Sequence, residues 1–412
     1  MLNPKTKERE LVYTVKIDEI RPIEGYDRVE HARVGGWWVI VQKDQFKVGD
    51  YAIYFEIDSK VPEKAEFAFL AKRHFKIKTL KMCKVVSQGL LMAIKDFADD
   101  SGKLPDWAER VTAIIKGYEG ELDEPIFLTA DLGVTYADAE DNARKGNSPS
   151  KYEKMRQRHL QLFKKPFFKW LYSKEWGKKI LFIFLGKKKD NRGWPAWVSK
   201  TDEERIQNMP FMFPGNPDEK WIATEKIDGT STTFTMKRNK MSFDYYVCSR
   251  NVCFDKPEKA EKCFYASNVY LEMSEKYNIE DKLKYILTND KELSFITIQG
   301  ETYGKDVQKR DYSITHHDFM AFNVIFGYKN GDKRRLNPIE MRDYLIKYDI
   351  PTVPIIDDAF IIPETCEEIL EIATGLSELD GKPREGLVFR SVDGVKSFKA
   401  VSNEFLLEYH SN

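Results

Sequence analysis

Two patterns of apolar and polar residues divide the chain. Across residues 10–95, apolar and β-branched residues mostly alternate with polar ones, which is the period of strands with one buried face. Strands are predicted within 11–23, 36–42 and 51–58 and at two places in 74–94, with a turn at 47–50. Five short strands in one such stretch favour a small closed barrel, most often of the OB type, over another kind of β domain.

From about residue 193 onward, strand-like and helix-like segments are mixed. The strand-like segments are 221–228, 231–238, 244–250, 294–304, 317–328, 385–391 and 395–402. Helices are predicted at 259–279, 337–349 and 364–376, and Asn337 followed by Pro338 is a typical helix start. Strands separated by isolated helices indicate an α+β domain with antiparallel sheets.

The stretch between these regions has strongly uneven charge. Residues 96–141 hold thirteen Asp and Glu but three Lys and Arg, whereas 144–192 hold sixteen Lys and Arg but three Asp and Glu. The acidic part is predicted to be a partly irregular connector, and 150–192 an aromatic helical insert broken near Pro166. The insert could dock on the next domain, contact an RNA backbone or lie on a membrane surface. The predicted domains are 1–95, 96–192 and 193–412.

The charge, cysteine content and apolar runs of the whole chain indicate which classes of protein it resembles and which it does not. The 412 residues carry no formal net charge, so total charge favours no particular partner. The five cysteines include no C-x-x-C pair, which favours a reducing compartment over a disulfide framework. The charged N-terminus shows no secretory signal, and the longest apolar run, 180–186, is too short to cross a bilayer. A cytoplasmic protein without a transmembrane segment is predicted.

The predicted barrel also carries alternating basic and aromatic residues. The alternating residues are the basic Lys43, Lys47, Arg73, His74, Lys76, Lys78, Lys81 and Lys84 and the aromatic Trp37, Trp38, Phe46 and Phe75. Basic and aromatic residues on one barrel face are suited to single-stranded nucleic acid. The same alternation also arises when apolar residues face a core and charged residues face solvent.

The stretch TEKIDGTSTTF, residues 224–234, contains a lysine with unusual neighbours. A lysine is a nucleophile only when neutral, so Lys226 would need burial or nearby cations to overcome its usual pKa of about 10.4. Asp228 could orient this lysine or help to hold a metal, and Gly229 would let the backbone approach a phosphate closely. The same letters also form an ordinary Asp-Gly turn between two strands.

Further motifs follow Lys226 in a fixed order. They are SRN at 249–251, GETYG at 300–304, FMAFNV at 319–324, EGLVFR at 385–390 and SFKAVSN at 397–403. Their order and spacing resemble those of the covalent nucleotidyltransferases, which include ATP-dependent ligases and mRNA capping enzymes. With SKTDEERIQN at 199–208 and an OB-like domain in front, the chain is most similar to ATP-dependent RNA ligases of the Deinococcus and Naegleria type.

The resemblance implies a role for each matching residue. The catalytic set would be Lys226, which becomes adenylylated, with Asp228, Glu301, Glu385 and Lys399. The residues that hold Mg²⁺ or Mn²⁺, mostly through water, would be Asp228, Glu301 and Glu385. The other ATP-binding residues would be Arg205 at the β- and γ-phosphates, Glu225 beside the adenine, Arg250 at the ribose, Phe322 stacked on the adenine and Lys399 at the α-phosphate. Lys396 is a further candidate, because the last motif of the family usually offers two lysines.

The resemblance further implies an enzyme that joins RNA 3′-OH and 5′-phosphate ends through a lysyl-AMP intermediate, for repair of nicked or broken RNA duplexes. We expect it to act as a monomer. The sequence given ends at Asn412, soon after Lys399, and so lacks the later OB domain usual in DNA ligases and capping enzymes. The alternatives are a ligase for DNA or mixed nicks and a catalytically inactive RNA-binding adaptor. Deletion of residues 1–95 is expected to spare self-adenylylation and to impair sealing.

Overall fold

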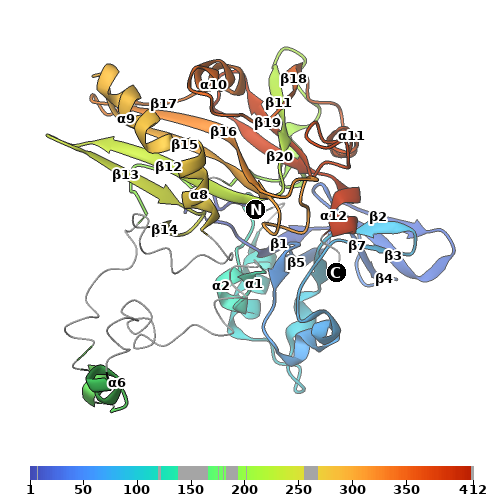
Figure 1. Cartoon of the computed structure of the whole chain (residues 1–412). Coiled ribbons are helices and arrows are strands. Elements are labelled where there is room, and N and C mark those ends of the chain that lie inside the picture. The colour runs from blue at the N-terminus through green and yellow to red at the C-terminus, as the bar shows by residue number, and fades with distance from the viewer. Residues whose placement is uncertain are drawn as a thin grey trace.

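The structure is a computed structural model in which an N-terminal domain lies against a larger C-terminal domain (Figure 1). The residues described are 1–6, 8–118, 122–137, 166–174, 176–179, 181, 194–200, 202–254 and 268–409. Within these ranges, no helix has both the length and the apolar character that crossing a bilayer requires.

The N-terminal domain is built of short antiparallel strands, as the alternating pattern predicts. One sheet has the order β1 (Val12–Lys16), β5 (Tyr51–Phe55), β9 (Leu90–Met92), and another the order β2 (Glu19–Ile23), β3 (Tyr26–Val34), β4 (Trp37–Gln42). Two small sheets pair β6 (Ser59–Lys60) with β10 (Thr135–Tyr136) and β7 (Leu80–Met82) with β8 (Val85–Ser87). The two main sheets enclose a shared core to which Tyr13, Val39 and Tyr54 contribute.

Two features of this domain differ from the strand prediction. β3 was not predicted, because its first three residues, Tyr26 to Arg28, are exposed and polar on both faces, so the alternation that marks a strand is missing. The stretch 74–94 contains three short strands instead of two. The predicted turn at 47–50 is present, and the Asp50 N–H donates a hydrogen bond of 3.0 Å to the carbonyl of Lys47.

Within the predicted connector, the described residues 106–118 and 122–136 contain two helices and a short strand that pack on the N-terminal domain. In α1 (Asp106–Gly117), apolar side chains recur at Trp107, Val111 and Ile115, so one helix face packs on the barrel. α2 (Thr129–Leu132) adds Leu132 to the same core, and β10 then pairs with β6. We therefore infer that this domain extends to about residue 137, beyond the predicted boundary at residue 95.

Most of the predicted basic helical insert lies outside the described residues. Its described part includes α6 (Pro166–Tyr172), which begins at the proline where a break was predicted. Leu171 of α6 packs with Leu181 and with neighbouring aromatic side chains. The uses suggested for residues 150–192 stay predictions.

The C-terminal domain contains two antiparallel sheets, as predicted. The larger has the order β14 (Cys253–Phe254), β13 (Phe243–Cys248), β12 (Thr230–Arg238), β15 (Leu293–Gly304), β16 (His317–Tyr328), β17 (Lys333–Arg335). The smaller has the order β18 (Ile355–Phe360), β11 (Trp221–Lys226), β19 (Gly386–Ser391), β20 (Ser397–Val401). These strands include all seven strand-like segments of the sequence.

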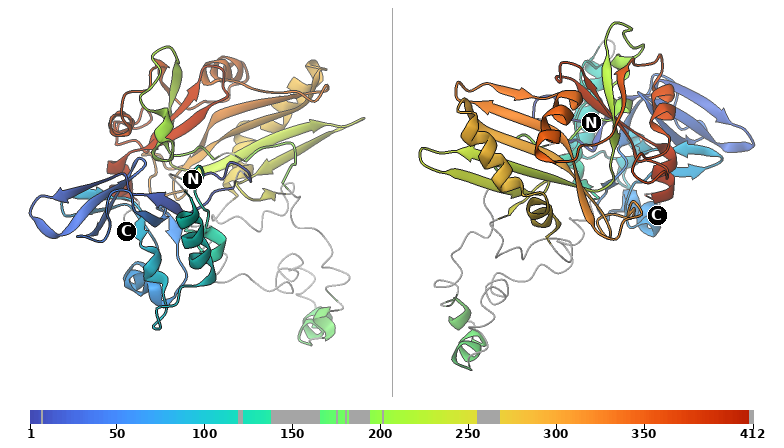
Figure 2. Two further views of the ribbon diagram at one scale, coloured as in Figure 1. Left: turned by 180° about the vertical axis from the view of Figure 1, so that it is seen from behind. Right: turned by 45° about the horizontal axis from the view of Figure 1, so that its top comes forward.

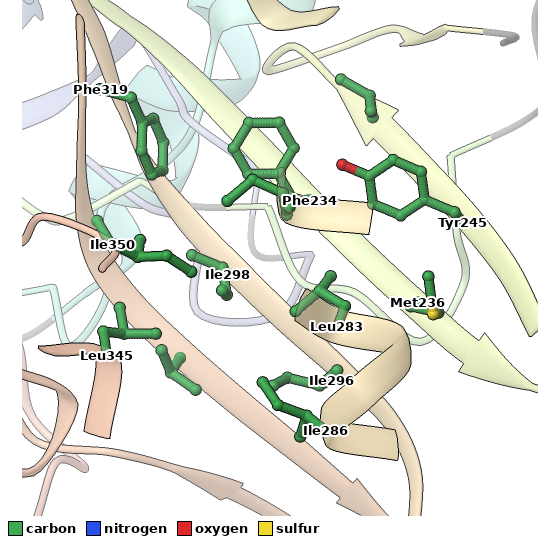
Figure 3. Packing of buried hydrophobic residues seen from close by; sticks show 14 of the residues in the cluster. Phe234, Met236, Tyr245, Leu283, Ile286, Ile296, Ile298, Phe319, Leu345 and Ile350 are labelled. Carbon is green, nitrogen blue, oxygen red and sulfur yellow. The ribbon is translucent and has the colours of Figure 1, made fainter. Parts of the chain in front are cut away.

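Helices α8 (Val269–Lys276) and α9 (Ile279–Asn289) cover one face of the larger sheet (Figure 1). Figure 3 shows Leu283 and Ile286 of α9 facing Ile296 and Ile298 of β15. Spacings of three or four residues on the helix and of two on the strand place these side chains on facing surfaces. α10 (Pro338–Leu345) adds Leu345 to this core and begins at the predicted cap, Asn337.

The smaller sheet packs on a separate set of helices. They are η3 (Ile206–Asn208), η4 (Pro210–Met212) and α11 (Cys366–Ala373), which share a core with β11, β19 and β20. The final helix, α12 (Asn403–Tyr409), leaves this sheet and reaches the N-terminal domain.

The two domains are joined by apolar and polar contacts. Val401 of β20 and Leu406 of α12 are buried within the core of the N-terminal barrel. The side-chain oxygen of Asn208 accepts hydrogen bonds from Trp37 Nε1 at 2.6 Å and from the Tyr13 hydroxyl at 3.2 Å. Figure 2 shows the N-terminal domain, blue to teal, lying against one side of the C-terminal domain. The relative placement of the domains is therefore set by buried side chains.

Candidate active site

A cavity of about 490 Å³ lies where the two C-terminal sheets and the N-terminal domain meet. Nine residues proposed from the sequence line it: Arg205, Glu225, Lys226, Asp228, Arg250, Glu301, Phe322, Glu385 and Lys399. They come from positions as far apart in the sequence as 205 and 399. The fold therefore gathers nearly the whole predicted set in one place.

Lys226 is the last residue of β11, and the pairing of β11 with β19 determines which side chains lie beside it. In the antiparallel register Lys226 lies opposite Gly386, so Glu385 comes beside it. Lys226 Nζ donates a hydrogen bond of 2.7 Å to Glu385 Oε1. Gly386 has a φ of 155°, and a Cβ there would lie 2.2 Å from the carbonyl oxygen of Ala400. A glycine is thus required where β19 begins beside Lys226.

The turn after Lys226 is held by the loop that follows β15. The Asp228 N–H donates to the Tyr312 hydroxyl oxygen at 2.6 Å, and Gln308 Nε2 donates to the carbonyl of Gly229 at 3.0 Å. A Cβ at Gly229 would lie 2.3 Å from the carbonyl oxygen of Thr302. Gly229 therefore lets the turn pack closely on β15. The sequence suggested a different reason for this glycine, namely that it lets the backbone approach a phosphate.

Three carboxylates surround the Lys226 amine. Burial raises the pKa of Glu301 to about 8, and burial together with the charge of Glu385 raises the pKa of Asp228 to about 8. Burial opposes the charge of Lys226, but Glu385, Glu301 and Asp228 outweigh it and raise the pKa of this lysine. The protein groups alone thus favour the ammonium form of Lys226.

A second cluster consists of cationic side chains that all contact the Asp202 carboxylate. This carboxylate accepts from Lys399 Nζ at 3.0 Å and from Arg9 Nε at 2.8 Å, and Arg250 Nη2 lies 3.0 Å from it. Burial, opposed by Asp202 and assisted by Arg9 and Arg205, lowers the pKa of Lys399 to about 8. Two predicted phosphate or ribose ligands, Arg250 and Lys399, thus share one internal counter-anion.

Arg205 connects the predicted site to the N-terminal domain. It precedes η3 and pairs with Lys399 across a parallel bridge. Its Nη2 lies 3.4 Å from Asp58 Oδ2 of the N-terminal domain. Asp58 and Tyr136 from that domain also line the cavity, so the cavity is shared between domains.

The predicted adenine-side residues lie on the strands that bound the cavity. Phe322 of β16 is half-buried beside Ile227 and Val353, so it is both part of a small core and part of the cavity wall. Glu225 accepts the N–H of Glu378 at 2.9 Å and bonds the Ser377 hydroxyl. The Glu225 carboxylate therefore ties β11 to the loop that precedes β19.

Lys396 is the one predicted residue that the structure does not bring to the cavity. Its Nζ bonds Glu219 Oε1 at 2.6 Å, and its side chain is 57% exposed. It lies in the turn before β20, whereas Lys399 lies within the strand. The placement of Lys396 therefore does not support its prediction as an ATP ligand, which stays untested.

Several lining residues were missed by the sequence analysis. They are Asp58, Lys76, Lys78, Tyr136, Asp202, Lys309 and Arg390. Asp202 lies within the quoted SKTDEERIQN stretch and could have been found there. Lys76 and Lys78 were noted only as part of a basic and aromatic surface, and nothing in the sequence places the four N-terminal residues beside Lys226, because only the docking of the domains brings them there.

Comparisons with known proteins agree with this arrangement. Residues 219–401 match a family model described as RNA ligase, and residues 11–94 match a model described as an OB-fold domain. No curated protein matches the sequence.

Several solved structures of an RNA ligase from Naegleria gruberi are similar to this chain. The form with PPi has a TM-score of 0.67 and 25% sequence identity, and the match covers 97% of this chain and 98% of that one. A variant with ATP and Mn has a TM-score of 0.68 at the same identity and coverage. Another variant, with AMP and Mn, has a TM-score of 0.66 at that identity and coverage. Residues 219–401 thus form an RNA ligase family domain, which follows an N-terminal domain that matches an OB-fold model over residues 11–94.

Proposed function

We propose that the chain joins RNA 3′-OH and 5′-phosphate ends with ATP, through a covalent AMP on Lys226. The observation that carries this proposal is the convergence of Lys226, its three carboxylates and the cations Arg250 and Lys399 on one cavity. The Naegleria gruberi enzyme, whose structures contain ATP, AMP or PPi, supports ATP as the nucleotide.

The reaction would begin with attack of Lys226 Nζ on the α-phosphate of ATP. A phosphorus–nitrogen bond forms, the bond to the leaving pyrophosphate breaks, and AMP stays on the lysine. Nζ must lose a proton to attack, and Glu385 Oε1 lies 2.7 Å from it. Lys399 and Arg250 can stabilise charge on the phosphate oxygens. AMP would next pass to an RNA 5′-phosphate, and an RNA 3′-OH would displace it.

The carboxylates fit a divalent ion held mostly through water. Glu385 Oε2 is buried and has no hydrogen-bond partner among the described residues, so an acceptor oxygen is aimed at the site. Among those residues, no group of three His, Cys, Asp or Glu side chains is close enough to bind a metal directly. Asp228, Glu301 and Glu385 are hard oxygen donors suited to Mg²⁺ or Mn²⁺. Such an ion would offset the carboxylate charge and favour the neutral lysine.

Covalent labelling tests the proposal. Full-length protein incubated with Mg²⁺ or Mn²⁺ and ATP labelled on the α-phosphate should acquire the label, and Lys226→Ala should acquire none. Lys396→Ala is the matched control, since Lys396 lies on the same domain outside the cavity, and it should label normally. Wild-type protein that takes up no label would favour the alternative of an inactive RNA-binding adaptor.

The choice of nucleic acid is tested by sealing. Nicked duplexes with RNA or DNA on each side of the nick should be compared under identical conditions. We expect RNA on both sides to be sealed fastest. Equal sealing of all-DNA nicks would instead support the polynucleotide ligase alternative.

A further inference from the structure

A buried ion pair lies next to the cavity but is not among the described residues that line it. Arg310 belongs to the loop between β15 and β16, and Asp380 belongs to the turn that precedes β19. Arg310 Nη2 donates a hydrogen bond of 2.5 Å to Asp380 Oδ1, and each side chain is only 2% exposed. Neither residue belongs to a motif singled out in the sequence.

This ion pair is poorly suited to stabilising the fold. Within the described part of the chain, Arg310 Nε and Asp380 Oδ2 are buried without a hydrogen-bond partner. Burying two charges costs free energy unless their remaining donors and acceptors are satisfied, and apolar side chains of similar volume are often at least as stable. The presence of the pair is therefore better explained by the groups that it holds in place.

Arg310 contacts Tyr312, the residue whose hydroxyl accepts the Asp228 N–H. The guanidinium carbon lies 4.2 Å from the centre of the Tyr312 ring, where a cation and an aromatic face attract each other. Tyr312 and Ser313 have φ values of 55° and 58°, a left-handed conformation that costs free energy in residues other than glycine. Such a conformation persists only where neighbouring groups hold it, and Arg310 is one of these groups.

The same arginine also holds the segment that leads to Glu385. Arg310 Nη1 donates a hydrogen bond to the carbonyl of Pro383, two residues before Glu385. Asp380 Oδ1 accepts the N–H of Lys382 at 3.1 Å, which fixes the turn that carries this carboxylate. One guanidinium therefore joins the loop between β15 and β16 to the start of β19.

We propose that Arg310 and Asp380 are positioning residues that fix the carboxylates of Asp228 and Glu385 around the Lys226 amine. Asp228 follows the end of β11 and Glu385 precedes the start of β19, so both carboxylates lie where regular strand pairing stops. Contacts between the adjoining loops therefore set their positions. This inference rests on the proposed function, because a misplacement of about 1 Å slows a reaction, by as much as about 100-fold, only if Lys226 reacts there.

Replacing both charges at once separates positioning from folding. In Arg310→Met with Asp380→Asn, the urea midpoint should stay close to that of wild type, because no buried charge is left unpaired. The single-turnover rate of Lys226 adenylylation should fall about 10-fold or more, whereas the Kd for Mg-ATP, measured by calorimetry in the Lys226→Ala background, should change less than about 2-fold. Arg342→Met with Asp343→Asn is the control, because it removes an exposed ion pair of α10 and should leave the rate unchanged.

A double-mutant cycle tests whether the pair acts through Tyr312. Tyr312→Phe alone removes the acceptor of the Asp228 N–H and should slow adenylylation about 10-fold. Added to the variant that lacks both charges, the same change should slow the reaction less than about 3-fold further, because the hydroxyl is already displaced. Effects that multiply in full would overturn the proposal.

Hydrogen exchange gives a readout that needs no activity. Peptides that contain the Asp228 amide or residues 305–316 should exchange faster in the variant that lacks both charges, whereas peptides from α9 should be unchanged. Arg310→Lys keeps a cation but not the planar fork; it should show smaller changes in the same peptides and in the rate, and it serves as the test if the double variant does not fold.

Unchanged exchange at Asp228, or a fall in ATP affinity as large as the fall in rate, would also overturn the proposal. Wild-type protein that never forms a covalent adenylate would contradict the proposed function, while exchange would still decide whether the ion pair holds the turn.

Discussion

Asp202 has an unusual number of cationic partners for one side chain. It contacts Arg9 of the N-terminal domain and Arg250 and Lys399 of the predicted ATP site, and 18% of its side chain is exposed. A phosphate would present similar oxygens to Arg250 and Lys399. Asp202 is therefore suited to holding these cations in place and compensating their charge, which lowers the cost of keeping them partly buried.

Replacing Asp202 with asparagine should destabilise the protein in a pH-dependent manner. Burial opposes the charge of Asp202, but Lys399, Arg9 and Arg250 outweigh it and hold its pKa well below the usual value. Its contribution is thus complete above the unfolded-state pKa of about 4 and is lost as pH falls through the folded pKa. We expect Asp202→Asn to lower the free energy of unfolding by about 3 kcal/mol at pH 7.

Urea denaturation at several pH values measures this effect. The difference between wild type and Asp202→Asn should shrink as the pH is lowered below about 4. Asp218→Asn, a change at an exposed position of the same domain, should have little effect at any pH. A difference that is the same at pH 7 and pH 3 would contradict the assigned role of the Asp202 charge.

At the scale of elements, the loop between β15 and β16 is hydrogen-bonded to the turn that carries Asp228. Tyr312 contributes the hydroxyl that accepts the Asp228 N–H. Tyr312→Phe removes this acceptor and leaves the buried N–H unsatisfied, which typically costs about 1–3 kcal/mol. We expect the single-turnover rate of Lys226 adenylylation to fall about 10-fold, because the turn and its carboxylate shift.

The neighbouring Tyr303 provides a matched control for that change. Its ring lies 5.1 Å from that of Tyr312 and is similarly buried, but it is not the residue that bonds the turn. Tyr303→Phe should therefore adenylylate at close to the wild-type rate. Equal effects of the two changes would show that the phenol of Tyr312 does not position Asp228.

Some helices and strands could be predicted from their residues, and others could not. β12 and β15 were predicted from their β-branched and aromatic residues, although most of their residues on both faces are buried, and α10 was predicted from its Asn337 cap. α9 was missed although its buried positions recur at helical spacing, because no Ser, Thr, Asp or Pro marks its start; Asn278 there has a left-handed conformation with no side-chain cap. α1 was hidden by the charge of the acidic stretch around it.

The site was predictable wherever one short motif contains its residue, as for Lys226 and Glu385. Its remaining wall was not predictable, because Lys78 and Tyr136 reach the cavity only through packing between distant segments. The position of Lys396 outside the cavity was not predictable for a related reason. Two lysines three residues apart look alike in a sequence, but only Lys399 lies in a strand that faces the cavity.

The shared cavity changes the expectation for the whole molecule. A division of labour in which residues 1–95 serve only sealing would leave Lys226 independent of the N-terminal domain. Asp58, Lys76, Lys78 and Tyr136 instead form part of the wall around it. We therefore expect self-adenylylation itself to depend on how the two domains are docked.

Gly36 offers a way to disturb that docking with one methyl group. It lies in the turn between β3 and β4, and its N–H donates to the carbonyl of Gln207 at 2.9 Å. A Cβ there would lie 2.6 Å from the Gln207 Cα and 2.8 Å from Cys366 Sγ, so the C-terminal domain would have to move. Because η3 follows directly on Arg205, this movement would displace a residue of the cavity.

We expect Gly36→Ala to slow single-turnover adenylylation of Lys226 at least 10-fold, since misplacement by about 1 Å can cost as much as 100-fold in rate. Gly117→Ala is the control, because a Cβ at Gly117 meets nothing within 4 Å and no left-handed φ is required there. That change should leave the rate unaltered and, in a helix, should slightly stabilise α1. Circular dichroism of both variants would establish that the domains stay folded. A wild-type rate in folded Gly36→Ala would mean that close docking against η3 is not needed for the first chemical step.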